Sequence, residues 1–237
     1  MIMSSCSNHN TLSIGHRGAK GYVAENTLES INKAIELGVD GIEIDIFKCL
    51  SNELVLFHDK DLDKLTGKPG QIENLTLKEL QEFLVLGKYQ IPTLKDVLIK
   101  IEKPLFVNIE LKGLDTAEAT SKIITDFSKN TSWSLENFIV SSFNWNELEQ
   151  FRSIDKNTPI GVLVSKSMSI NEAIEFGKKI DAQAIHPNYT LLDEKTVKKI
   201  KNNGFKIYTW TVNNKDDINF IKKLKVDGII SDYPDRI

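Results

Sequence analysis

Short apolar runs alternate with amphipathic segments along almost the entire sequence, and this alternation limits the possible folds more than any other feature. The amphipathic segments have helical spacing, and several begin at Ser, Thr, Asn or Asp and end near Gly or a lysine cluster. Regular alternation of this kind is typical of parallel strands joined by crossover helices. About eight such units fit into the chain, which predicts a closed (β/α)8 TIM barrel, with a doubly wound open sheet as the alternative. The apolar runs with strand character are TLSIGH, GIEIDIF, ELVLFH, LFVNIEL, FIVSSF, IGVLVS, AQAIHP, KIYTWTV and GIISD.

Residues 59–92 interrupt this alternation. They hold much turn chemistry, including the stretch GKPG, and one short capped helical pattern, LTLKELQEF. Because a segment of this size is too small for a hydrophobic core of its own, we expect it to pack as a cap over one rim of the barrel. The predicted domain plan is a flexible tail at residues 1–10, followed by a single barrel at residues 11–237 that contains the inserted segment.

Composition and charge exclude several classes of protein. With 237 residues, of which 41% are hydrophobic, the chain is long enough for one large core. The formal net charge of −3 gives no electrostatic reason to expect nucleic acid or an anionic membrane surface as a partner. Two cysteines do not form a disulfide framework. No apolar run approaches the roughly 20 residues of a membrane span, so we expect no span.

The first ten residues, MIMSSCSNHN, have two interpretations. As written they contain neither a charged n-region nor an apolar h-region, which favours a cytoplasmic protein with a polar tail. The stretch MSSC, however, resembles the end of a bacterial lipoprotein signal. In that case Cys6 would carry the lipid of a periplasmic or envelope lipoprotein, and the true start would lie upstream.

Ionisable side chains gather at the carboxyl ends of four predicted strands. In a barrel of this type, residues at the carboxyl ends of the strands face the functional site. Glu43 and Asp45 are two residues apart, as are Glu110 and Lys112, so strand alternation directs each pair to one face. We therefore expect two histidines, three carboxylates, an arginine and a lysine at one place. The residues are His16, Arg17, Glu43, Asp45, His58, Glu110 and Lys112.

The three carboxylates predict a metal site. Glu43 and Asp45 alternate with isoleucines, so their side chains point toward the barrel interior, where like charges are costly without a compensating cation. Carboxylate oxygens with no cysteine nearby are hard ligands, which favours Mg²⁺ or Ca²⁺. The alternative is a carboxylate cluster that Arg17 and Lys112 neutralise without any metal.

With these residues the sequence resembles the glycerophosphodiester phosphodiesterase family. The segments that carry the resemblance are GHRG…ENT, GIEIDI, LVLFHD, NIELK, YTWTVN and DGIISDYP, which occur in this order from about Ile14 to Pro234. The resemblance implies a TIM barrel with a small insertion after the second histidine strand. It also implies metal-dependent hydrolysis of glycerophosphodiesters, such as glycerophosphocholine, to glycerol 3-phosphate and an alcohol.

The resemblance also implies a role for each matching residue. The first nucleophile would be the neighbouring glycerol hydroxyl, giving a cyclic phosphate that water then opens. Near-neutral imidazoles suit the two proton transfers, and cationic groups neutralise the phosphate oxygens. The implied roles are metal ligands for Glu43, Asp45 and Glu110, general acid and base for His16 and His58, and phosphate partners for Arg17 and Lys112.

Three further residues are candidates for the substrate pocket. Phe143 and Trp210 lie near the ends of late strands and are suited to wall a glycerol pocket, although aromatic residues at such positions are as often plain packing. Glu25, in the Glu-Asn-Thr stretch, either contributes to the site or holds the Arg17 loop.

Two other functions remain open from the sequence. A phospholipase D- or C-like barrel acting on intact phospholipid needs an exposed apolar or basic rim, whereas the inserted segment is mixed in charge. A non-catalytic barrel that binds a polyol phosphate would lack one of the histidines or carboxylates, and this sequence has all of them. We expect a small-molecule substrate as the partner.

Overall fold

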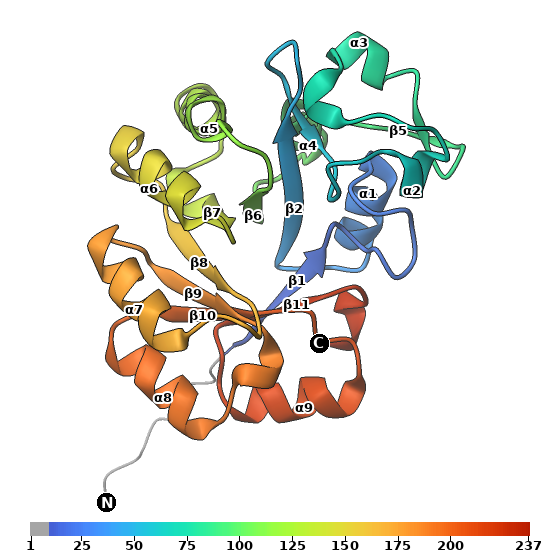
Figure 1. The fold of residues 1–237 in the computed structure, drawn as a ribbon. Helices are drawn as coiled ribbons and strands as arrows, with labels where there is room; N and C mark the ends of the chain where they lie inside the picture. Colours follow the sequence, from blue (N-terminus) through green and yellow to red (C-terminus); the bar gives the residue numbers. More distant parts are fainter. Residues whose placement is uncertain (1–9) are drawn as a thin grey trace, which may run out of the picture.

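In the computed structural model, which describes residues 10–237, eight parallel strands close into a barrel with helices around it (Figure 1). The strand order is β1-β11-β10-β9-β8-β7-β6-β2, and β1 also pairs with β2, which closes the ring. The predicted TIM barrel is therefore confirmed, and the open doubly wound sheet is wrong. The barrel strands are β1 (Leu12–His16), β2 (Gly41–Lys48), β6 (Phe106–Leu111), β7 (Phe138–Ser142), β8 (Ile160–Val164), β9 (Ala184–Pro187), β10 (Lys206–Thr209) and β11 (Gly228–Ser231).

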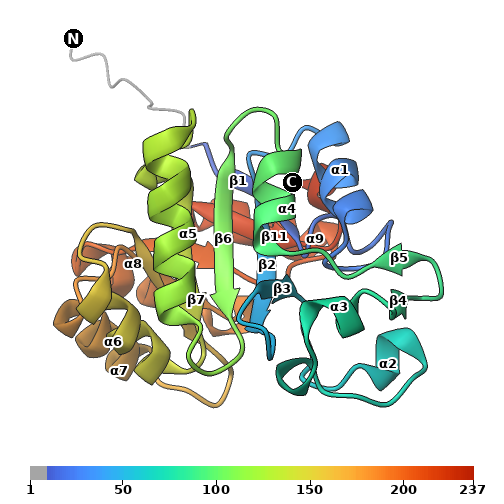
Figure 2. The same cartoon turned by 90° about the horizontal axis from the view of Figure 1, so that it is seen from above.

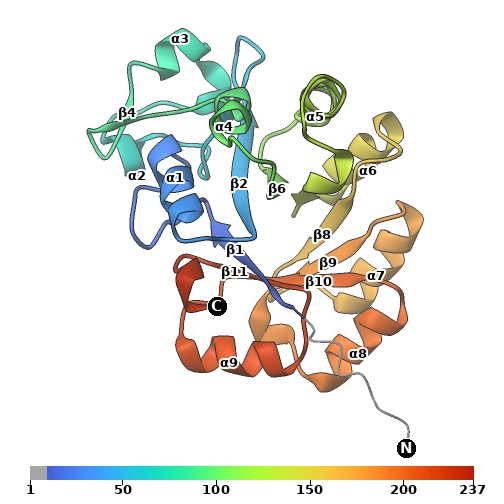
Figure 3. The same ribbon diagram turned by 180° about the vertical axis from the view of Figure 1, so that it is seen from behind.

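Seven longer helices of the described chain cover the outside of this barrel (Figures 1 and 3). Most of them begin at a polar residue whose side chain accepts a hydrogen bond from the first turn, as Thr27, Ser169 and Asp193 do. Only a 3-10 turn, η4 (Pro234–Arg236), follows the last strand. The helices are α1 (Leu28–Glu36), α4 (Leu94–Lys100), α5 (Ala117–Asn130), α6 (Trp145–Ile154), α7 (Ile170–Lys179), α8 (Glu194–Asn202) and α9 (Lys215–Lys223).

Strand β2 shows how the core and the site share one element. Ile42, Ile44 and Ile46 are fully buried and belong to the main hydrophobic cluster. Their neighbours Glu43 and Asp45 are also buried, but strand alternation directs them to the opposite face, inside the barrel. The apolar face thus fixes β2 in the wall while the other face carries charge.

The inserted segment lies beside the barrel, next to β2 and β3 (Figure 2). Its buried side chains, among them Leu62, Ile72 and Leu80, form a second hydrophobic cluster together with Phe47 and Phe57 near the segment's base. The segment therefore has no core wholly of its own, in line with its small size, and shares one with β2 and β3. Its elements are α2 (Asp63–Thr66), η1 (Ile72–Asn74), α3 (Leu77–Leu80), β4 (Leu84–Val85) and β5 (Tyr89–Gln90).

Strand β3 (Leu54–Leu56) differs from its prediction in direction. It runs antiparallel to the far end of β2, with Ile46 opposite Leu56, and is not a strand of the closed barrel. His58 therefore does not end a parallel barrel strand. It follows Phe57, whose backbone N–H donates a hydrogen bond to the carbonyl oxygen of Asp45 on β2 at 3.1 Å. An apolar run predicts a strand but contains no information about its direction.

The predictions of a flexible tail and of no membrane span concern the amino-terminal residues and the helices. Residues 1–9 of the predicted tail, including Cys6, lie outside the described residues. Within residues 10–237, no helix has the length and apolar character needed to cross a membrane.

Candidate active site

The GHRG segment at the carboxyl end of β1 begins the site, and its two glycines are required by close packing. A Cβ on Gly15 would lie 2.2 Å from the carbonyl oxygen of Gly18. Gly18 has a positive φ of +85°, and a Cβ there would lie within 2.7 Å of Ser30. Between them, Arg17 also adopts a positive φ, of 51°. This tight turn brings the backbone N–H of Arg17 to within 2.9 Å of Glu43 Oε2, to which it donates a hydrogen bond.

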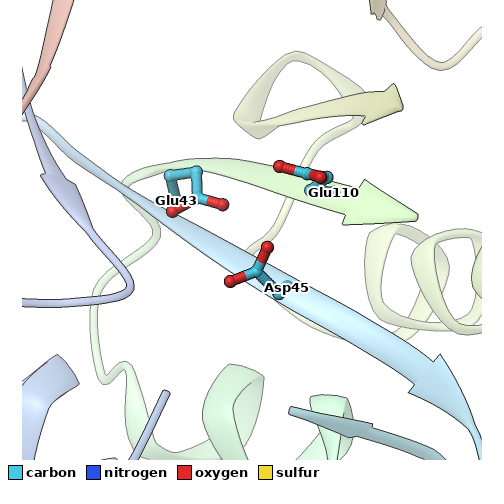
Figure 4. A group of neighbouring side chains, drawn as sticks. All are labelled: Glu43, Asp45 and Glu110. Atoms are coloured by element: carbon cyan, nitrogen blue, oxygen red, sulfur yellow. The ribbon is translucent and has the colours of Figure 1, made fainter. Parts of the chain in front are cut away.

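Strand register brings the three predicted metal ligands together. Asp45 on β2 lies opposite Glu110 on β6, and Glu43 lies opposite Asn108 on the same pair of strands. All three carboxylates project on the same side of these two strands (Figure 4). One oxygen from each carboxylate lies within 4.8 Å of the others.

Buried oxygens without partners mark this cluster as suited to a cation. Glu43 Oε1 and Asp45 Oδ1 are buried and have no hydrogen-bond partner among the described residues. Burial, followed by repulsion from the neighbouring carboxylates, raises the pKa of Glu43 well above its ordinary value and that of Glu110 to about 7. A divalent ion would supply the missing ligand contacts and the missing positive charge, so the residues present fit Mg²⁺ or Ca²⁺.

Two cationic side chains offset part of the charge. Arg17 Nε lies 3.1 Å from Asp45 Oδ2, and Lys112 Nζ lies 2.8 Å from Glu110 Oε1. Although burial opposes it, the positive charges of Arg17 and Lys112 hold the pKa of Asp45 below its ordinary value. Arg17 is also tied to Glu25, at 2.5 Å. Two cations among three carboxylates leave net negative charge for a metal to compensate.

His16 is held by a carboxylate from the other end of the chain. Its Nδ1 lies 2.5 Å from Oδ1 of Asp232, and Asn213 donates a hydrogen bond to the second oxygen, Oδ2, at 2.8 Å. Burial lowers the pKa of His16, and the hydrogen bond to Asp232 only partly offsets this. Because a carboxylate accepts and does not donate, neutral His16 carries its proton on Nδ1. Its Nε2 is then free to accept a proton.

His58 has a similar arrangement in a more open place. Its Nδ1 lies 2.6 Å from Asp59 Oδ1, and Lys64 donates to the second oxygen of Asp59 at 3.0 Å. Burial lowers the pKa of His58 too, assisted by the nearby charges of Arg17 and Lys112. The His58 side chain is 29% exposed, compared with 14% for His16. Of the two imidazoles, His58 is therefore the one in easier contact with solvent.

A cavity of about 100 Å³ opens among these residues at the barrel mouth. Phe143 and Trp210 form one wall, with their rings edge to face at a centroid distance of 5.2 Å. Glu25 and Lys112 are not part of its lining: Glu25 pairs with Arg17 and with Lys20, and Lys112 faces a neighbouring groove. The ionisable residues that line the cavity are His16, Arg17, Glu43, His58 and Glu110.

The sequence analysis did not assign a role to three residues that hold the site in place. Asp232 follows the last barrel strand, so the strand-end rule could have found it. Asn26 precedes Thr27, whose side chain caps α1. Asn26, at a φ of 57°, donates to Asp45 Oδ2 at 2.9 Å and accepts from the Asp45 backbone N–H at 3.2 Å. Asp59 lies next to His58, and only its contact with that ring distinguishes it from a surface carboxylate.

Comparisons with known proteins agree with one another. Residues 16–236 match the model of the glycerophosphoryl diester phosphodiesterase family. A glycerophosphodiester phosphodiesterase of Caldanaerobacter subterraneus is 33% identical over 236 residues, with 96% of each chain covered. The structure of a glycerophosphodiester phosphodiesterase from Thermotoga maritima is similar at a TM-score of 0.81 and 31% identity, covering 96% of this chain and 97% of that one. An Oleispira antarctica phosphodiesterase, solved in complex with the product sn-glycerol-3-phosphate, has a TM-score of 0.85 and 27% identity, with 94% of each chain covered.

Proposed function

The chain belongs to the glycerophosphoryl diester phosphodiesterase family, and from that premise we propose that it hydrolyses glycerophosphodiesters to sn-glycerol 3-phosphate and an alcohol at the mouth of its barrel. The observation that carries the proposal is the meeting of two histidines and a buried cluster of carboxylates around one small cavity. We treat residues 11–237, insertion included, as the single domain that performs this reaction.

Glu43, Asp45 and Glu110 would hold a divalent metal, Mg²⁺ or Ca²⁺. When bound, such an ion draws charge from the phosphate oxygens and makes phosphorus easier to attack. The guanidinium of Arg17 lines the same cavity and would neutralise a second phosphate oxygen. Lys112 donates a hydrogen bond to Glu110 and lines the neighbouring groove, so it would add positive charge near the phosphate from that side.

His16 is the proposed base of the first step. Its lowered pKa keeps it neutral near pH 7, and the Asp232 contact leaves Nε2 as the free lone pair. In this step His16 Nε2 takes the proton of the glycerol hydroxyl next to the phosphate. The hydroxyl oxygen bonds to phosphorus, and the bond between phosphorus and the head-group oxygen breaks.

His58 is the proposed acid of the same step. It lies at the open side of the cavity, on the proposed path of the departing alcohol. Because burial lowers the pKa of His58 as well, this step uses the minor fraction of molecules in which His58 is protonated, and there its imidazolium gives a proton to the alkoxide. In the second step the roles reverse: His58 removes a proton from water as water opens the cyclic phosphate, and His16 returns its proton to the glycerol hydroxyl. Both histidines are then in their starting states.

A compound that lacks the attacking hydroxyl tests this function. If that hydroxyl is the first nucleophile, proximity supplies roughly 7–11 kcal/mol of the barrier reduction. We expect rapid release of glycerol 3-phosphate from glycerophosphocholine and almost no hydrolysis of its 2-deoxy analogue, which should still bind as an inhibitor. Bis(p-nitrophenyl) phosphate should also react slowly despite its better leaving group. Rapid hydrolysis of the 2-deoxy analogue would mean that water attacks directly.

A further inference from the structure

A second and larger cavity adjoins the catalytic one. This groove, of about 770 Å³, lies between the inserted segment and the chain that leaves β6. His58 lines both the groove and the catalytic cavity. Lys112 also lines the groove, and its hydrogen bond to Glu110 joins the groove wall to the carboxylate cluster. His58 and the Lys112–Glu110 pair therefore lie at the border of the two spaces.

The sizes of the two cavities favour different parts of a substrate. The catalytic cavity, at about 100 Å³, is much smaller than the groove, at about 770 Å³, so we expect it to hold only part of a glycerophosphodiester. With glycerol against Trp210 and the phosphate at the carboxylate cluster, the remaining substituent on phosphorus has to extend past His58. The groove begins at that point.

The groove has an excess of unpaired negative charge. Four carboxylates line it, and two of them are already paired: Asp59 with Lys64 at 3.0 Å and Glu73 with Lys60 at 3.3 Å. The other two are Asp61 and Asp63, and neither forms an ion pair within residues 10–237. Asp61 accepts only a neutral hydrogen bond in that part of the chain, from Gln71 at 2.9 Å.

We propose that this groove holds the departing alcohol of the substrate, and that Asp61 and Asp63 favour alcohols with a cationic amine over neutral ones. The proposal rests on the proposed function and adds a substrate class to it. An ammonium group that has passed His58 enters a space where both unpaired carboxylates are accessible. The pairs formed are solvent-exposed, so the preference is moderate and depends on salt.

The test compares glycerophosphoethanolamine, whose alcohol is cationic, with glycerophosphoglycerol, whose alcohol is neutral. The variant is Asp61→Asn combined with Asp63→Asn, which removes two charges but keeps an oxygen acceptor for Gln71. Asp126→Asn is the control, because Asp126 is an exposed carboxylate that lines a different hollow, beside α5. The measured quantity is kcat/KM for both substrates at low salt and at about 0.5 M NaCl.

We expect the double variant to lose about three- to tenfold in kcat/KM for glycerophosphoethanolamine and less than about twofold for glycerophosphoglycerol. High salt should reduce the wild-type preference, and the control should behave as wild type. An equal loss for both substrates, or no loss for either, would overturn the proposal while leaving the hydrolytic function intact. Absence of glycerol 3-phosphate from both substrates with the wild type would instead refute the proposed function, and the groove assignment with it.

Discussion

The two halves of the catalytic cavity differ in chemistry. Residues from β1, β2, β6 and the chain after β3 supply its ionisable groups, including His16 and Glu43. Residues at or after β7, β8, β10 and β11 supply only neutral ones, including Phe143, Leu163 and Trp210. In the proposed mechanism the charged half moves protons and holds a metal and a phosphate, whereas the neutral half determines only what fits. The difference indicates that chemistry and substrate shape are controlled by separate parts of one barrel.

Burial of the charged half lowers the stability of the fold, whereas burial of the neutral half does not. Glu43, Asp45 and Glu110 are at most 8% exposed, and burial of like charges is unfavourable without full compensation. In the neutral half, side chains such as Leu163 and Ile230 are buried without such a penalty. Variants in the two halves should therefore affect different quantities: turnover in the first and substrate affinity in the second.

The largest effect is expected from the two histidines. His16→Ala and His58→Ala should each lower kcat by about 10²–10⁴-fold, the usual contribution of a positioned acid or base. The double variant should lose much less than the product of the two single losses, because the pair acts as a unit. Steady-state rates of glycerol 3-phosphate release measure this. Near-normal turnover in either single variant would mean that this histidine is not a catalytic acid or base. The charged half would then not be the part of the cavity that controls turnover.

Asp232→Asn tests whether the charged half depends on the orientation of His16. Asn213 donates to one oxygen of Asp232, so an asparagine at position 232 would keep its oxygen there and turn its NH₂ toward His16 Nδ1. His16 would then carry its proton on Nε2 and could not act as the base. We expect kcat to fall between about tenfold and 10⁴-fold, as for other catalytic histidines held in the wrong tautomer. A rise in KM at unchanged kcat would contradict this positioning role.

Trp210→Ala should have a smaller effect of a different kind. It removes part of the cavity wall against which we propose that glycerol packs, so we expect KM to rise by about tenfold with kcat changed by less than about threefold. Trp210→Phe is the matched control, since it keeps an aromatic ring against Phe143. If Trp210→Ala lowers kcat as strongly as the histidine variants do, the neutral half takes part in the chemistry.

Substitution of His186 is expected to have the smallest effect on activity. It lies on β9 in the barrel interior, 1% exposed, with its ring against Tyr208 and directly over Gly161, and it does not line the catalytic cavity. Both of its ring nitrogens lack hydrogen-bond partners among the described residues. The replacement His186→Leu should therefore leave kcat/KM within about twofold of wild type, since the ring lies outside the catalytic cavity.

The same variant should change how stability depends on pH. Burial lowers the pKa of His186 to about 3, so between its ordinary pKa and that value only the unfolded chain takes up the proton. The wild type should then lose up to about 1.4 kcal/mol of unfolding free energy per pH unit as pH falls below about 6.5, on account of this residue. Denaturant unfolding at pH 7 and pH 5 should give a steeper loss for wild type than for His186→Leu. Parallel losses would contradict the burial of a neutral imidazole.

Part of this arrangement could be predicted from the sequence because it depends on local periodicity. The spacing of Glu43 and Asp45 on one apolar strand determines their common face. The alternation of apolar runs and helical patterns predicts parallel strands joined by helices, and the pairing of β1 with β2 shows that these close into a barrel. The direction of β3 could not be predicted, because an apolar run of three residues has the same pattern in either orientation. The contact of His16 with Asp232 spans 216 residues of sequence and exists only because β11 closes the barrel against β1.

The central claim is that the charged half works through a divalent metal at Glu43, Asp45 and Glu110. The most direct measurement is the rate of glycerol 3-phosphate release from glycerophosphocholine after exhaustive chelation and again after Mg²⁺ or Ca²⁺ is restored. Chelation should abolish the rate and one of the two ions should restore it in the wild type, whereas Glu43→Gln, which keeps the side-chain volume but removes a charge, should need far more metal. A rate that chelation leaves unchanged would contradict the claim, and the cluster would then be neutralised by Arg17 and Lys112 alone.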